Sequence, residues 1–226
     1  MAYKLLQLPV EAMASASEEG RAEYARWFRE SLNSRIACLE EAVGQGWTAD
    51  FEPESLTPLG TWFASVVKSV ERTEDEIAKM QARLAPHIKV PKMRPSDKSA
   101  SLAYDIAMYF GETLRRQDER LDWVLGAHPT GQMLVTTPTL PMARPCDPVG
   151  LMLVWTFGMV AGKLDGSRLH QLFEIWSRLV TEIVHSSRKT EPASGGPCCS
   201  GKLPSDQLDS RDVASTASIR VRDHHS

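Results

Sequence analysis

An uncharged, apolar stretch from Val149 to Gly162 constrains the fold more than any other feature of this chain. Its 14 residues are fewer than the roughly 20 that a membrane-spanning helix needs. Asp147 and Pro148 precede it, an N-cap residue followed by proline at the first helical position, which is a typical helix start. The sequence therefore predicts a helix buried in the core of a folded domain, and no membrane partner.

The segment before this stretch predicts a long helix followed by a β-hairpin. Ser96 is the predicted N-cap of this helix, and residues 101–117, SLAYDIAMYFGETLRRQ, carry apolar side chains at helical spacing. Residues 121–125 alternate in the way of a short strand, and residues 132–137 offer the return strand. One face of the long helix is small throughout, so we expect Gly158 and Gly162 of the apolar helix to approach it closely. The small residues are Ala100, Ala103, Ala107 and Gly111.

Helical spacing extends over most of the first 185 residues. It predicts a helix from Ser17 to Val43, a second from Thr57 to about Val70, and a last one from about Leu169. Thr73 and Glu76 have the spacing of a capping box, so a helix restarts there. The predicted fold class is α+β and mainly helical, with about five helices and one small β-hairpin.

Composition divides the chain into a folded domain, residues 1–185, and a tail, residues 186–226. The tail is rich in Ser, Asp, Pro and Gly and has no aromatic residue, so we expect it to be disordered. The whole chain has 26 Lys and Arg against 29 Asp and Glu, a net charge of −3. The tail has 6 basic and 5 acidic residues, so the folded domain carries −3 − 1 = −4. This balance disfavours a nucleic-acid partner.

The cysteines and the start of the chain predict a cytoplasmic protein. Four irregularly placed cysteines do not form a disulfide framework, which suits a reducing compartment. The apolar residues in the first 13 positions are too few and too interrupted for a secretory signal.

A polar line on the long helix is the best candidate site. Asp105, Tyr109, Glu112 and Arg116 recur at helical spacing, and they can offer two carboxylates and an aromatic contact to a basic partner. A structural role is the alternative, in which the carboxylates pair with arginines. Three more residues are candidate binding residues: Trp123 in the hairpin, and Lys163 and Asp165 in the turn after the apolar helix.

The remaining motifs do not indicate catalysis, metal binding or phosphate binding. The histidines have no metal-ligand spacing, and no nucleophile or phosphate-binding motif is present, so we expect no metal, cofactor or catalytic residue. A hydrolase is the alternative hypothesis, in which Asp105 and Glu112 act with or without a metal and converge with His128 or His170.

Three segments resemble a pattern of uncharacterised bacterial protein families. They are DIAMYFGETL (residues 105–114), the W-x-L of the predicted strand, and the later G-K-x-D-G. Members are small cytosolic proteins, some of them beside secreted toxin systems, and the resemblance carries no catalytic residue. It implies a bacterial cytosolic protein and favours an immunity-type role.

The leading hypothesis is a non-enzymatic cytosolic protein-binding module, in its specific form an immunity-type protein that neutralises a toxin domain. The enzyme remains the alternative from a different class. A third possibility is a structural subunit that forms an oligomer through close-packed glycine helices.

Overall fold

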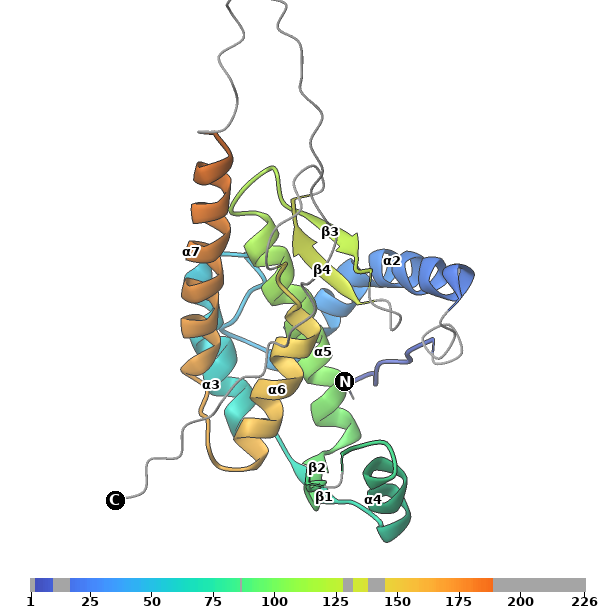
Figure 1. The fold of residues 1–226 in the computed structure, drawn as a ribbon. Helices are drawn as coiled ribbons and strands as arrows, with labels where there is room; N and C mark the ends of the chain where they lie inside the picture. The colour runs from blue at the N-terminus through green and yellow to red at the C-terminus, as the bar shows by residue number, and fades with distance from the viewer. Residues whose placement is uncertain (1–2, 10–16, 86, 128–131, 138–144, 189–226) are drawn as a thin grey trace, which may run out of the picture. The chain divides into compact units, whose positions relative to one another are not determined.

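Six α-helices and two small antiparallel sheets make up the described part of the chain (Figure 1). The structure, a computed structural model, describes residues 3–9, 17–85, 87–127, 132–137 and 145–188, with side chains up to Val180. The helices are α2 (Glu18–Val43), α3 (Leu56–Val66), α4 (Glu74–Gln81), α5 (Asp97–Arg115), α6 (Pro148–Val160) and α7 (Arg168–Arg188), and a 3₁₀ turn (Pro53–Ser55) precedes α3. The strands are β1 (Ser69–Glu71), β2 (Met93–Pro95), β3 (Asp122–Leu125) and β4 (Met133–Thr136). The predicted fold class is confirmed.

Side-chain caps begin four of these helices where the sequence predicts them. The side chains of Ser17, Ser96 and Asp147 each accept a hydrogen bond from a backbone N–H of the first helical turn. Thr73 and Glu76 form the complete capping box at the start of α4. Each cap satisfies an N–H that the helix itself leaves without a partner, which is why these boundaries can be read from the sequence.

Helix α5 is the centre of the fold. It packs against α2, α6 and α7, and the β4 strand also contacts it (Figure 1). Every residue from Ser101 to Leu114 is buried, polar residues included. The polar line that the sequence predicts on α5 therefore lies almost entirely inside the protein.

The predicted hairpin is present, and a second two-stranded sheet accompanies it. β3 pairs with β4 through Trp123 and Val135. β1 pairs with β2, with Val70 opposite Arg94. The prediction that the second helix reaches Val70 is wrong, because α3 ends at Val66 and Val70 is an exposed strand residue.

The expected glycine contact between α5 and α6 is also wrong. A Cβ added to Gly158 would meet Leu164, and one added to Gly162 would meet nothing within 4 Å. The close backbone approach occurs elsewhere, between α3 and the turn before α7. A Cβ on Gly60 would lie 2.1 Å from the carbonyl oxygen of Gly166, so the two segments pack with no room for a side chain.

The end of the domain extends slightly past the predicted boundary. Helix α7 continues to Arg188, while the predicted tail begins at residue 186. The rest of that tail, from residue 189, lies outside the described residues. Among the described helices, none has the length and apolar content that a bilayer span requires.

Candidate functional site

Asp105 forms a buried ion pair with Arg35, which comes from the middle of α2. Arg35 Nε donates to one carboxylate oxygen at 2.7 Å and Nη2 donates to the other at 2.7 Å. Asp105 has no exposed surface, and the Arg35 side chain is 8% exposed. Burial raises the pKa of the Asp105 carboxyl above its usual value, and the hydrogen bonds from Arg35 and from Tyr3 oppose that rise.

The same pair fixes the segment of residues 3–9 against α2 and α5. The Tyr3 hydroxyl donates to Asp105 and in turn accepts from Arg35 Nη2 at 2.7 Å. Arg35 Nη1 donates to the backbone carbonyl of Lys4 at 3.0 Å. The Ser101 hydroxyl accepts the backbone N–H of Leu6 at 2.7 Å. Asp105 is thus bound by two other parts of the chain, α2 and the segment of residues 3–9.

Tyr109 fixes the loop between α2 and α3 through hydrogen bonds. Its hydroxyl accepts the backbone N–H of Phe51 at 3.0 Å and lies 2.6 Å from the Ser55 hydroxyl. Phe51 has a φ of 62°, in the left-handed region that residues other than glycine rarely adopt. Its ring also receives the Arg116 guanidinium at 3.5 Å. Tyr109 and Arg116 together hold this unusual loop residue in place.

Glu112 connects the end of α5 to the hairpin. Its carboxylate pairs with Arg115 at 2.8 Å and with Arg116 at 3.1 Å, and it accepts the indole N–H of Trp123 at 3.3 Å. Burial alone would raise the pKa of Glu112, but these three partners outweigh it and the pKa is lowered. The Trp123 ring lies against Gly111, whose missing side chain makes room for it.

The structure thus places the predicted binding residues in two groups. Asp105, Tyr109, Glu112 and Trp123 are buried and bonded to other parts of the chain. Three are on the surface: Arg116, Lys163 and Asp165. Asp165 accepts hydrogen bonds from the backbone and hydroxyl of Ser167, and its own carbonyl accepts the indole N–H of Trp155, so it organises the turn before α7.

The two carboxylates of the hydrolase hypothesis do not meet. Asp105 pairs with Arg35, whereas Glu112 lies two helical turns later and pairs with Arg115 and Arg116. His170 lies on α7 with Glu174 as its neighbour, at 4.0 Å. The other histidine of that hypothesis, His128, lies outside the described residues. No observation on the described residues favours this hypothesis.

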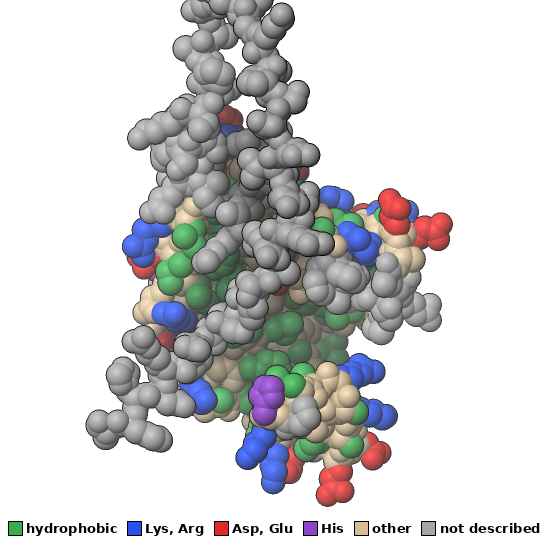
Figure 2. All heavy atoms as spheres, viewed as in Figure 1, with side chains coloured by type: hydrophobic (Ala, Val, Ile, Leu, Met, Phe, Trp, Pro, Cys, Tyr) green, Lys and Arg blue, Asp and Glu red, His purple; other side chains and the backbone are tan. Residues whose placement is uncertain are grey.

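The outer side of α6 presents apolar side chains to solvent. Val154 is 70% exposed and Phe157 is 37% exposed, and Leu164 in the following turn is also exposed. Figure 2 shows hydrophobic side chains gathered on this face, where α6 lies in Figure 1. The prediction of a buried helix is therefore right for one side only, that of Met152 and Trp155.

The β1–β2 sheet lies beside this exposed side. β2 contacts α6, and Met93 at its start is 41% exposed. The Arg72 guanidinium, just after β1, lies 5.9 Å from the centre of the Phe157 ring. Lys163 follows α6 and is exposed. We call Val154, Phe157, Leu164 and Met93 the α6 surface; it is an apolar surface with two basic side chains beside it.

Sequence reasoning missed Arg35 and Tyr3, the partners of Asp105. The sequence does contain a signal for Arg35. This residue occupies a position between Phe28 and Leu39 that the helical spacing of α2 places on its buried face. A charged residue in an apolar register indicates a buried pair, since such residues are almost never fully buried alone. Tyr3 had no comparable signal, because it lies outside any predicted element.

No family model matches this chain, and neither the curated proteins nor the solved structures match it significantly.

Proposed function

We propose that this protein is a non-enzymatic protein-binding module and that the α6 surface is where its partner docks. The observation that supports this proposal is the exposure of Val154. This residue is 70% exposed, and it lies on a helix that contains no charged residue. Covering one such aliphatic side chain contributes about 1.5–3 kcal/mol, so an exposed apolar stripe is a strong reason for association. Contiguous exposed apolar surface commonly marks protein-interaction sites.

The basic residues beside the α6 surface specify the partner further. Arg72 and Lys163 are placed to pair with carboxylates at the edge of an interface. The partner we propose is a protein segment with apolar side chains flanked by acidic ones. In this proposal the buried polar residues of α5 do not contact the partner. They hold α5 in place, and α6 packs against α5.

The specific form of the proposal is an immunity-type cytosolic protein whose partner is a toxin domain. It rests on the resemblance of residues 105–114. The α6 surface supports docking of a protein but does not by itself select a toxin.

Quantitative affinity capture with the full chain tests the docking surface. Val154→Glu places a charge in the middle of the α6 surface, and Ile175→Glu makes the same change at an exposed apolar residue of α7. We expect one stoichiometric protein to be captured by the wild type and by Ile175→Glu. We expect Val154→Glu to lose at least 90% of it without a change in its thermal midpoint.

Three outcomes contradict the proposal. The first is capture of the partner by Val154→Glu at the wild-type level, and the second is the absence of any stoichiometric protein. The third is capture of only an untagged copy of this chain, which would assign the α6 surface to self-association and support a structural subunit. A captured partner that is not a toxin domain would reject the immunity-type form alone.

A further inference from the structure

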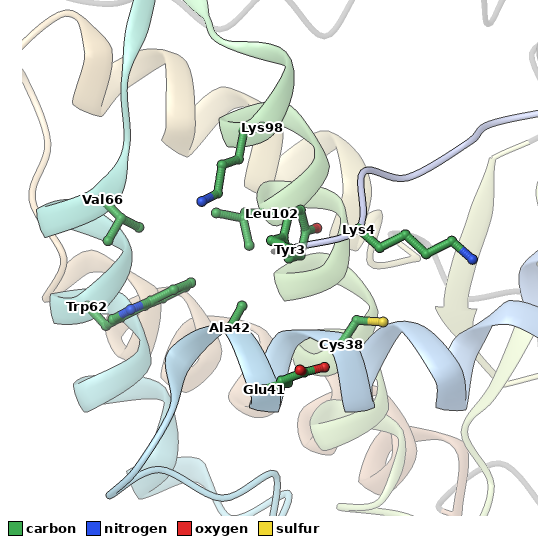
Figure 3. Close-up of a pocket in the computed structure, with 9 residues that line it drawn as sticks. All are labelled: Tyr3, Lys4, Cys38, Glu41, Ala42, Trp62, Val66, Lys98 and Leu102. Atoms are coloured by element: carbon green, nitrogen blue, oxygen red, sulfur yellow. The ribbon is translucent and has the colours of Figure 1, made fainter. Parts of the chain in front are cut away.

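A cavity on another part of the domain has the features of a small-ligand site. It lies between α2, α3, α5 and the segment that contains Tyr3, and its volume is about 380 Å³ (Figure 3). Sites for small ligands have volumes of about 300–1,000 Å³, so this one fits a ligand of modest size. The wall that Tyr3 forms is held by its bonds to Asp105 and Arg35, so the cavity exists before any ligand binds.

The walls of this cavity combine flat apolar surface with one inward-facing cation. The Trp62 indole extends along one side, and Leu102 and the Tyr3 ring form the opposite side (Figure 3). Lys98 points into the space between them, while Lys4 points away from it. Of the charged side chains that line the cavity, two are lysines and one is Glu41, and Lys98 is the lysine that points into the space.

Lys98 has no carboxylate partner within the described residues. Its ammonium lies 5.9 Å from the centre of the Tyr3 ring, a cation–π distance, and no ion pair involves it there. It belongs to the first turn of α5, where the helix dipole adds further positive potential. The ammonium is therefore a hydrogen-bond donor that is available to an anionic ligand.

We propose that this cavity binds a small aromatic carboxylate. The carboxylate accepts hydrogen bonds from the Lys98 ammonium, and the aromatic ring packs between Trp62 and Tyr3. A polyanion such as a nucleotide fits poorly, because Lys98 is the single lysine that points into the space and Glu41 also lines the cavity. The site is separate from the α6 surface, so either can exist without the other.

Titration calorimetry of the full chain with 2-naphthoate tests this proposal. We expect saturable binding with one site and a Kd below 1 mM, and no heat with 2-naphthylmethylamine, which replaces the carboxylate by a cation. Lys98→Met should weaken binding at least tenfold, while Lys98→Arg, which keeps the charge, should stay within threefold of the wild type. Trp62→Leu should also weaken binding at least tenfold.

Two controls separate this site from other parts of the protein. Lys163→Met removes a lysine outside the cavity and should leave the Kd unchanged. Val154→Glu should also leave it unchanged, so failure of the ligand site and failure of the docking surface are told apart. The proposal is overturned if 2-naphthoate does not saturate, if Lys98→Met binds it as tightly as the wild type, or if the amine binds equally well.

Discussion

The Asp105 carboxylate has no contact with solvent, so its negative charge must be compensated inside the protein. Arg35 provides this compensation through an ion pair. We predict that Arg35→Met lowers the free energy of unfolding by about 3–5 kcal/mol, since it leaves a buried charge without its partner. The loss should shrink as the pH falls, because a carboxyl that takes up a proton no longer needs the guanidinium. Urea unfolding at pH 7 and at pH 5 measures both effects.

The control for this variant is Arg120→Gln, which breaks an exposed ion pair with Asp118. Exposed pairs contribute little, so its unfolding midpoint should match that of the wild type. Equal midpoints for Arg35→Met and the wild type would show that Asp105 does not need the pair.

Glu112 makes the stability of the folded domain depend on pH, and the direction of its pKa shift gives the sign of this dependence. Its pKa in the folded protein is lower than the ordinary 4.5, so the unfolded chain takes up the proton first as the pH falls. The ionised carboxylate therefore stabilises the fold above pH 4.5, and this contribution is lost as the pH falls through the lowered pKa. We predict that wild type and Glu112→Gln differ most near pH 7 and converge towards pH 3.

Chemical unfolding at several pH values measures this convergence. A difference between Glu112→Gln and the wild type that stays constant from pH 7 to pH 3 would contradict it.

Among the elements, the contact between α3 and the turn before α7 tolerates the least change. We predict that Gly60→Ala destabilises the domain by about 1–3 kcal/mol, because its Cβ would overlap the Gly166 carbonyl, which is backbone and cannot rotate away. Gly158→Ala is the matched control, also a helical glycine. The three atoms nearest its Cβ would all belong to the side chain of Leu164, which is exposed and can therefore move.

Thermal unfolding monitored by circular dichroism separates the two glycine variants. Gly60→Ala should unfold at a clearly lower temperature, and Gly158→Ala should unfold near the wild-type temperature. The reverse order would contradict the observed packing.

Local chemistry made the starts of four helices predictable. Ser17, Ser96 and Asp147 cap helices through bonds to residues three positions later, so a short window of sequence contains all the information. Strands β1 and β2 are three residues each, too short for alternation to show, and their pairing depends on distant segments. The sequence therefore predicts the main helices and one hairpin but not the second sheet.

The candidate site was less predictable because its contacts are distant in sequence. Asp105 lies 70 positions from Arg35 and 102 from Tyr3, and no pattern within one helix reports such partners. Spacing along α5 correctly places Asp105, Tyr109 and Glu112 on related faces. The spacing does not show whether those faces contact solvent or other segments, because that depends on how the whole chain packs.

At the level of the whole domain, stability is distributed unevenly. The core of α5 contains 15 buried residues, whereas α4 contains none. We predict that the backbone amides of α4 exchange with solvent at least about 100-fold faster than those of Ser101–Leu114, because α4 can open without disturbing the core. Hydrogen–deuterium exchange with mass spectrometry measures both segments in one experiment. Equal protection would mean that α4 unfolds only with the entire domain.

The Arg35–Asp105 pair also limits how the chain can change over evolution. Replacing either residue alone leaves an uncompensated group in the interior, whereas replacing both by apolar residues of similar volume is often harmless. The two positions are therefore expected to change together. In a related chain, a methionine or leucine at position 35 should accompany an apolar residue at position 105.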